Sequence, residues 1–348
     1  MTAPPPQAPL SGGLRVRSTW DDVESPHRDT VWQHLRALRH APPGGAHSGD
    51  RRKTFGSALE QAEQLLEAAA TVGYAARPIL LFYGLSQAGR AVAAAAKSAT
   101  SPAAWRLRGH GIEVSNLDQR PGLHQLVVRD SGSGSFVQLA GLLRSGTLPN
   151  GASLGQVWAA IPDLRTTPID AGTEYLTPLT LGGWRTRGGQ IISPVCGLPW
   201  RFTDPYTEAD IIGYLASYPS LVGSQNAAPD HAFPQETTRT ADVPRVWPLP
   251  AGQDPDPFIA SRTRPYRGDD ERWVFPALGG SPVPLHPLLA WWAVLYTLSM
   301  LARYEPASWE AHLNVDAEPD AVPLEAALSR ALDTCPQLIL HAIRAVST

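Results

Sequence analysis

Cysteine is nearly absent from this chain, which contains only Cys196 and Cys335 among its 348 residues. Two thiols cannot form a disulfide framework, and they cannot build a structural metal site on their own. The histidines are scattered, with no His-x-x-x-His spacing and no Cys/His pairs that would indicate metal binding. We therefore expect free thiols, no metal and no cofactor.

Long apolar runs and charge of one sign are missing as well. The longest apolar window, Leu288 to Leu301, is too short to cross a bilayer, and residues 1–6 lack the basic flank and apolar run of a signal peptide. We therefore expect a cytoplasmic protein with no membrane partner. The net charge of −3 gives no overall attraction to nucleic acid, so such an attraction would need a local basic patch.

Lysine is the third scarce residue type, because Lys53 and Lys97 are the only lysines among 29 basic residues. With abundant alanine, glycine and proline, this composition is typical of the coding bias of a GC-rich bacterial genome, and it indicates no mechanism. Hydrophobic residues, in contrast, make up 43% of the chain. A chain of this length and hydrophobicity can bury a full core, so we expect a globular protein.

Residues 78 to 98 are the most regular stretch and predict a buried helix. Leu81, Leu85 and Ala88 recur at four- and three-residue spacing, as one face of a helix requires. Residues 287 to 304, rich in leucine and tryptophan, predict a second buried helix. Since both helices are apolar and carry small residues that allow close approach, we expect them to pack against each other in the centre of the protein.

Each of these two helices also carries one polar stripe. A buried guanidinium needs a partner, so Arg90 and Arg303 either bond internal carboxylates and helix-end carbonyls or line a shared anion pocket. His110, between two glycines of a predicted turn, either fills that turn or serves as a general acid or base that Glu113 could orient. No catalytic residue is identified. The candidate binding residues are Tyr83, Gln87, Arg90, His110, Tyr296, Ser299 and Arg303.

The remaining patterns indicate an α+β, mainly α fold, with a helical-bundle core, a small β-hairpin or sheet region and a long Pro-rich irregular segment. A hairpin with a loose loop is expected from residues 123–128 and 136–142. Short strands are expected at 174–181 and 190–196. Further helices are expected over residues 31–39, 53–72, 101–107, 153–164, 208–218, 324–332 and 337–346.

Composition also predicts the division of the chain. Residues 1–19 are rich in proline and glycine and are expected to be disordered. Residues 20–348 are expected to form a single, mainly helical domain. Within it, residues 223–271 are rich in proline, aspartate and arginine, and we expect an irregular insertion with no regular secondary structure beyond single turns.

Two glycine-rich segments resemble catalytic motifs without matching them. In Gly84-Leu-Ser-Gln-Ala-Gly89 the second glycine comes one residue too late for a nucleophile elbow. The loop from Ser131 to Ser135 lacks the Gly-Lys-Ser/Thr of a phosphate loop, so the better interpretation is a flexible hairpin tip.

Three short motifs occur in order along the chain: Leu-Phe-Tyr-Gly-Leu-Ser-Gln-Ala-Gly-Arg at 81–90, the Gly-His-Gly turn at 109–111, and Leu-Ser-Met-Leu-Ala-Arg-Tyr-Glu-Pro-Ala-Ser-Trp at 298–309. Together they resemble the bacterial YaaC-like family, whose function is uncharacterised. With the composition, this resemblance favours a non-enzymatic binding or interaction module. Its partner would be an anionic ligand or nucleic acid, bound through a local arginine pocket.

A weaker resemblance is to HEPN-type helical bundles, where a tyrosine-rich helix also precedes a His-Gly turn. Many ribonucleases of that type carry an arginine followed four to six residues later by a histidine, and Arg28 and His34 have this spacing. The alternative function is therefore a nucleic-acid-processing enzyme. An enzyme needs an acid/base group beside a charge stabiliser, whereas a binding module needs only a complementary surface.

Overall fold

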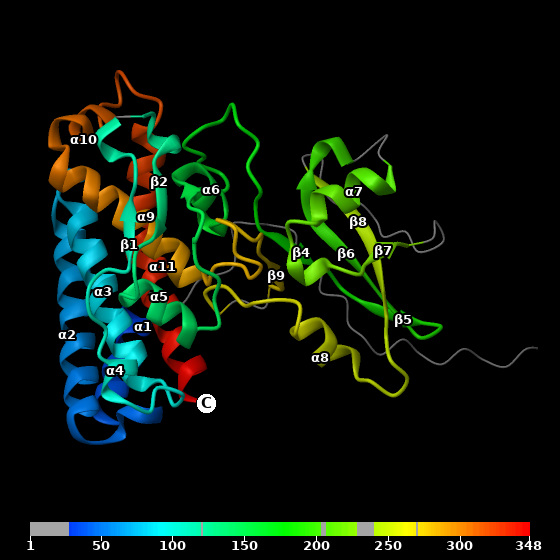
Figure 1. Cartoon of the computed structure of the whole chain (residues 1–348), viewed down its shortest axis with the longest axis horizontal. Helices are drawn as coiled ribbons and strands as arrows, with labels where there is room; N and C mark the ends of the chain where they lie inside the picture. Colours follow the sequence, from blue (N-terminus) through cyan, green and yellow to red (C-terminus); the bar gives the residue numbers. More distant parts are fainter. Residues whose placement is uncertain (1–27, 120, 203–206, 228–239, 269–270) are drawn as a thin grey trace, which may run out of the picture.

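The computed structural model describes residues 28–119, 121–202, 207–227, 240–268 and 271–348. Helices and a small three-stranded sheet form one end of the molecule, and a six-stranded sheet with short helices forms the other (Figure 1). The predicted α+β, mainly α fold is confirmed. The predicted disorder of residues 1–19 lies outside the described residues.

The helices are α1 (Arg28–His40), α2 (Gly49–Thr71), α3 (Arg77–Ala95), α4 (Pro102–Trp105), α5 (Ser135–Leu142), α6 (Leu154–Ala159), α7 (Glu208–Leu215), α8 (Pro255–Ala260), α9 (Pro287–Tyr304), α10 (Pro306–His312) and α11 (Ala321–Ser347). The strands are β1 (Ile112–Val114), β2 (Val127–Asp130), β3 (Ala152–Ser153), β4 (Leu179–Leu181), β5 (Arg185–Arg187), β6 (Gln190–Pro199), β7 (Gln225–Asn226), β8 (Thr240–Pro248) and β9 (Trp273–Val274).

Helices α3 and α9 pack against each other in the helical core, as the sequence predicts. Phe82 of α3 meets the edge of the Trp292 ring of α9, with ring centroids 6.0 Å apart. A Cβ atom at Gly89 would lie 2.6 Å from the same indole, so only glycine lets the two helices come this close. The small residues of α3 therefore serve helix packing.

Helix α11 is one continuous helix with Pro336 inside it, whereas the sequence predicts two helices, over 324–332 and 337–346. Proline removes one backbone hydrogen bond and usually kinks or ends a helix. Here the buried face continues through the proline, since Cys335, Leu338 and Ile339 are all 2% exposed or less. Packing on both sides of the proline therefore outweighs the local preference.

The predicted hairpin of 123–128 with 136–142 is wrong. Residues 135–142 form α5, while β2 pairs with β1 and β3 in an antiparallel sheet. Phe136, Leu139 and Ala140 are fully buried at the three- and four-residue spacing of a helix. Burial against the helical core therefore decides the structure of a segment that is also rich in strand formers.

The second sheet has strand order β7-β8-β6-β4-β9, with β5 pairing with β6. The prediction that residues 223–271 lack regular structure is wrong, because β7, β8 and α8 lie there. In β8, Ala241, Val243, Arg245 and Trp247 alternate as buried residues, which is the period of a strand. The Arg245 side chain is 1% exposed and donates to Glu208 and to Ser224, tying β8 to α7 and the chain before β7.

No helix in the described part of the chain is both long and apolar enough to cross a membrane.

Candidate functional site

A cleft of about 600 Å³ opens between the Gly-His-Gly turn, the loop that precedes α5, and α9. Its floor and walls combine backbone, hydroxyl, amide and charged groups. The lining residues are Arg108, Gly109, His110, Gly111, Ile112, Glu113, Ser131, Ser133, Gly134, Gln138 and Tyr296.

The turn at 109–111 is built by its glycines, as predicted. Gly109 and Gly111 have φ of 64° and 72°, a region that side chains disfavour. A Cβ atom at Gly111 would lie 2.6 Å from the backbone of Gly134, so the turn and the loop are in direct contact. The carbonyls of Gly109 and His110 accept from the backbone N–H groups of Ser135 and Phe136, at 3.3 and 2.9 Å. The turn therefore caps the first turn of α5 and fixes the edge of the cleft.

The imidazole of His110 lies beside two aromatic rings at the cleft. Its centroid is 5.7 Å from that of Phe82 and 5.8 Å from that of Tyr296. Partial burial lowers the pKa of His110, and the positive charges of Arg303 and Arg90 lower it further. The ring is therefore neutral at pH 7, and both arginines lie within electrostatic range of it.

Arg303 has polar partners but no carboxylate. Its Nε donates to the Ser299 carbonyl at 3.1 Å, and one terminal nitrogen donates to the Tyr83 hydroxyl at 3.0 Å. Its third contact is the Met300 sulfur. No carboxylate of the described residues pairs with this guanidinium, which is half-buried. Its charge therefore remains available to an anion beside it.

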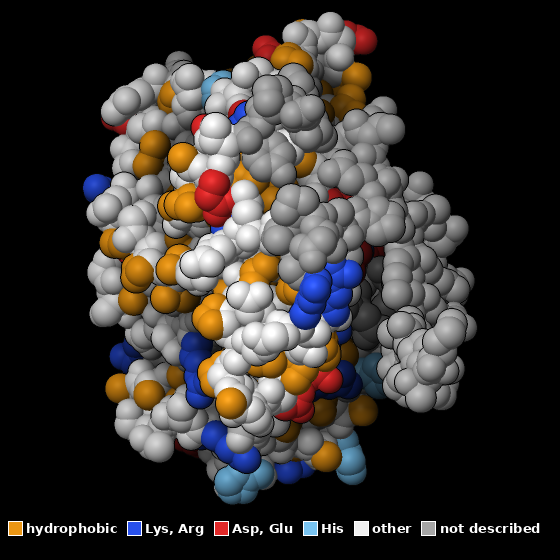
Figure 2. Space-filling view, turned by 90° about the vertical axis from the view of Figure 1, so that its right-hand side faces the viewer, with side chains coloured by type: hydrophobic (Ala, Val, Ile, Leu, Met, Phe, Trp, Pro, Cys, Tyr) orange, Lys and Arg blue, Asp and Glu red, His pale blue; other side chains and the backbone are white. Residues whose placement is uncertain are grey.

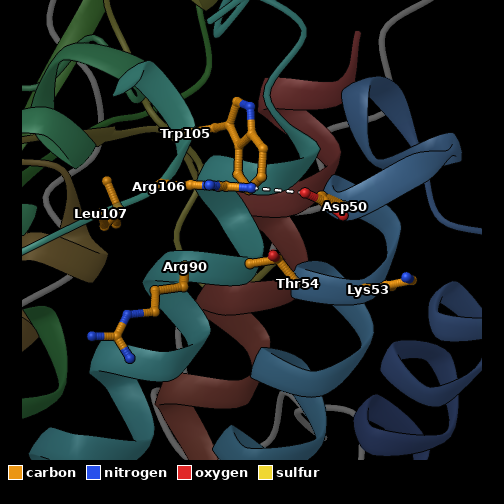
Figure 3. Close-up of a pocket in the computed structure, with 7 residues that line it drawn as sticks. All are labelled: Asp50, Lys53, Thr54, Arg90, Trp105, Arg106 and Leu107. Atoms are coloured by element: carbon orange, nitrogen blue, oxygen red, sulfur yellow. Dashed lines mark hydrogen bonds and ion pairs between the residues drawn. The ribbon is translucent and has the colours of Figure 1, made fainter. Parts of the chain in front are cut away.

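Arg90 is similar, since its guanidinium donates to the Gln87 amide oxygen at 2.9 Å. It is half-buried and, like Arg303, has no carboxylate partner within the described ranges. Arg90 lines a second cavity of about 290 Å³, together with Asp50, Lys53, Thr54, Trp105, Arg106 and Leu107. Figure 3 shows its side chain extending from α3 away from Lys53, while Arg106 reaches Asp50 at 2.8 Å.

Six of the seven candidate residues fall into three places, and the seventh, Ser299, lies apart from them. His110 and Tyr296 line the cleft, Tyr83 meets Arg303 beside it, and Gln87 meets Arg90 at the second cavity. Ser299 is fully buried and its hydroxyl donates to the Tyr296 carbonyl at 2.8 Å, so it does not reach the cleft.

Glu113 does not orient His110 as expected. Its carboxylate accepts from Arg129 at 2.7 Å and from the Ser131 hydroxyl at 3.0 Å, and these two bonds lower its pKa. The carboxylate thus ties β1 to β2 and to the loop. No group of three or more His, Cys, Asp or Glu in the part of the chain that the structure describes could hold a metal ion.

Sequence reasoning missed Arg108, Ser131, Ser133, Gly134 and Gln138 as lining residues. The sequence signal for this contact was a Gly-x-Gly pattern in both the turn 109–111 and the loop 132–134. Glycines in both segments allow the two backbones to come into contact. The interpretation of 131–135 as a hairpin tip hid this signal, since it placed the loop in solvent.

A family model described as YaaC-like Protein matches residues 24–343 of the chain. The three motifs at 81–90, 109–111 and 298–309 all lie inside the matched range. No curated protein and no solved structure gives a significant match.

Proposed function

The chain belongs to the YaaC-like protein family, and we propose that it acts as a binding module that captures an anionic ligand in the cleft beside His110. The ligand would lie against the turn at 109–111 and the loop 131–134, with its negative charge directed toward Arg303. Tyr296 would form the apolar side of the site.

One observation carries this proposal: Arg303 and Arg90 are half-buried on α9 and α3, which pack together, and their side chains donate only to neutral oxygen and sulfur atoms among the described residues. Two half-buried cations near one cleft raise each other's energy, and an anion between them relieves that repulsion. A purely structural arginine instead has its donors bonded to internal acids or carbonyls, as Arg51 does with the carbonyls of Ala94, Ala96 and Ala99.

Binding is favoured over catalysis because the cleft lacks a completed acid/base pair. Glu113 is engaged by Arg129 and Ser131, which leaves His110 without a carboxylate to orient it. The alternative of a HEPN-like ribonuclease has no support. The family match does not extend to that class, and Arg28 and His34 lie on α1, which packs against α2 and α11 and lines neither cavity.

Isothermal titration calorimetry with adenosine 5′-monophosphate tests the proposal, with adenosine as the uncharged control. We expect the monophosphate to bind and adenosine to bind at least ten-fold more weakly. Arg303→Gln should weaken monophosphate binding about 10- to 100-fold, the effect of losing a charge-assisted hydrogen bond. The exposed Arg187, at the opposite end of the molecule, provides the matched control variant Arg187→Gln.

Arg303 also bonds the Ser299 carbonyl, so thermal unfolding of each variant must be measured alongside. A folded Arg303→Gln protein that binds monophosphate as the wild type does would remove the proposal. Equal affinity for adenosine and the monophosphate would do the same, because the site would then not select for charge.

A further inference from the structure

We infer that the cleft and the second cavity form one continuous site for single-stranded nucleic acid; this inference rests on the proposed anion-binding function and names its ligand class. The groups that would hold the strand are Lys53, Arg106, Arg90, Arg108, His110 and Arg303. Phosphates would lie along the cations, and bases would stack on the tyrosines next to Arg303.

The two cavities are lined by adjacent residues of one stretch of chain. Residues 105–107 line the second cavity, and residues 108–113 line the cleft. Fully extended, 105–111 would span at most about 25 Å. Helix α3 also links the two places, because its Arg90 lines the second cavity and its Tyr83 bonds Arg303 beside the cleft.

A stripe of residues on α3 also runs along this site. Tyr83, Gln87 and Arg90 recur at four- and three-residue spacing, so they form one stripe on the helix. The stripe extends about 10 Å along the helix axis. Its one end, Tyr83, contacts Arg303, and its other end, Arg90, lies at the second cavity. A ligand that reaches both ends must therefore be elongated.

The charge along this path is positive, although the whole chain is negative. Lys53 and Arg108 are exposed, and neither has a carboxylate partner in the described ranges. Of the two acids along the path, Asp50 is paired with Arg106 and Glu113 with Arg129. Unpaired cations spread over a length, rather than focused on one point, match a chain of phosphates.

Exposed aromatic side chains stand at the Arg303 end. Tyr83 and Tyr304 are 38% and 61% exposed, and the Arg303 guanidinium lies 5.6 and 5.3 Å from their ring centroids. Unpaired bases can stack on the flat faces of these tyrosine rings and of the guanidinium. A duplex keeps its bases stacked inside, so this feature favours a single strand. At the β-rich end of the molecule, basic, acidic and hydrophobic side chains are instead interspersed over the described part of the face in Figure 2.

Fluorescence anisotropy with a labelled twelve-nucleotide single strand, as U12 or dT12, tests the inference on the full-length protein. We expect the strand to bind at least ten-fold more tightly than adenosine 5′-monophosphate, with affinity that falls as salt rises. Lys53→Gln and Arg108→Gln should each weaken binding and lower the salt slope by about 1. Tyr304→Ala should weaken strand binding about 5- to 100-fold through lost stacking.

The controls separate this inference from the proposed function. If the strand binds no more tightly than the monophosphate, while Arg303→Gln still abolishes monophosphate binding, the inference fails and the proposed function stands. If neither ligand binds, both fail. If Arg187→Gln at the far end weakens strand binding as much as Arg108→Gln, the attraction is not localised to this site and the inference is overturned. Tighter binding of a twelve-base-pair duplex than of the single strand would overturn it as well.

Discussion

The two ends of the molecule have separate hydrophobic clusters and are built in different ways. In the helical end, buried residues recur along single helices that pack on one another, as in α3 and α9. In the β-rich end, the cluster joins β4, β6, β8, α7 and α8, whose residues are far apart in sequence. All residues lining either cavity belong to the helical end or its three-stranded sheet. The candidate site therefore depends on helix packing, and the β-rich end contributes no residue to its lining.

A polar network joins the two ends at Asp163. The Tyr266 hydroxyl donates to its carboxylate at 2.6 Å, and the Thr334 hydroxyl donates to the same oxygen at 2.7 Å. Arg267 pairs with the other oxygen at 3.2 Å, and the Trp291 indole donates to the Tyr266 hydroxyl at 3.1 Å. Burial raises the pKa of Tyr266 well above its usual range, so its hydroxyl remains a donor. A segment that follows α8 is thereby anchored to α9 and α11.

Breaking this network should have the largest effect on stability. Asp163→Ala leaves Tyr266 and Thr334 without their acceptor and Arg267 without its ion partner, and we expect a loss of about 3 to 5 kcal/mol in the free energy of unfolding. Asp163→Asn keeps an oxygen acceptor and should lose less. Urea unfolding followed by tryptophan fluorescence measures both variants. A loss below about 1 kcal/mol for Asp163→Ala would mean that the two ends are held together by something else.

The second prediction concerns His286, which begins α9 in the helical end. Its Nδ1 accepts from the Leu288 N–H at 3.1 Å, so this nitrogen must be unprotonated. Burial lowers its pKa to about 3, with further contributions from Arg264 and His341. Between about pH 3 and pH 6.5 this histidine is protonated in the unfolded chain and neutral in the folded chain. The contribution of His286 to the free energy of unfolding is therefore fully present above pH 6.5 and decreases as the pH drops toward 3.

At pH 5 the free energy of unfolding is lower by about 2 kcal/mol than at pH 8. This value follows because pH 5 lies roughly 1.5 units below the unfolded pKa of 6.5, at about 1.36 kcal/mol per unit. His286→Asn keeps a side-chain acceptor for the helix start and removes the titration. Urea unfolding of both proteins at pH 8 and pH 5 measures the difference. If the variant loses as much stability between these values as the wild type, His286 is not the group responsible.

The helical end could be predicted from sequence because its signals are local. The spacing of Leu81, Leu85 and Ala88 suffices to place a helix, and its contact with α9 follows from the apolar character and the small residues that both helices share. The same spacing at Phe136, Leu139 and Ala140 was present, yet the strand-forming composition of 136–142 obscured it. Pro336 shows the opposite case, because this helix breaker lies between the two predicted helices and the buried residues on either side join them into one.

The β-rich end and the site could be predicted only in part, because their decisive contacts are long-range. The alternation of Ala241, Val243, Arg245 and Trp247 is a strand signal, but an arginine at a buried position hides it until Glu208 is known to be nearby. Of the residues on the predicted polar stripes, Tyr296 lines the cleft and Arg90 lines the second cavity, and their role in binding stays a prediction. The spacing could not reveal that Ser299 bonds its own helix, since that depends on the rotamer of its side chain.

The last prediction compares one interaction in both ends. Ser153 and Thr207 begin α6 and α7 with the same capping box: each hydroxyl accepts from an N–H three residues on, at 3.2 Å, and the side chain of that residue accepts in return. Ser153→Ala and Thr207→Ala should each cost about 1 kcal/mol of helix stability. Helix α6 is held against α9 and buries four of its six residues, whereas α7 buries only Ile211 and Leu215 of its eight.

The same lost cap should therefore fray α7 more than α6. Hydrogen exchange should become roughly five-fold faster for the amides of α7 in Thr207→Ala and change less for those of α6 in Ser153→Ala, because packing opposes opening where it is dense. Thr207→Ser restores the hydroxyl and should restore wild-type exchange. Neither variant should alter monophosphate binding, since neither residue lines a cavity. If the two helices fray equally, the difference in packing between the two ends does not determine the stability of these short helices.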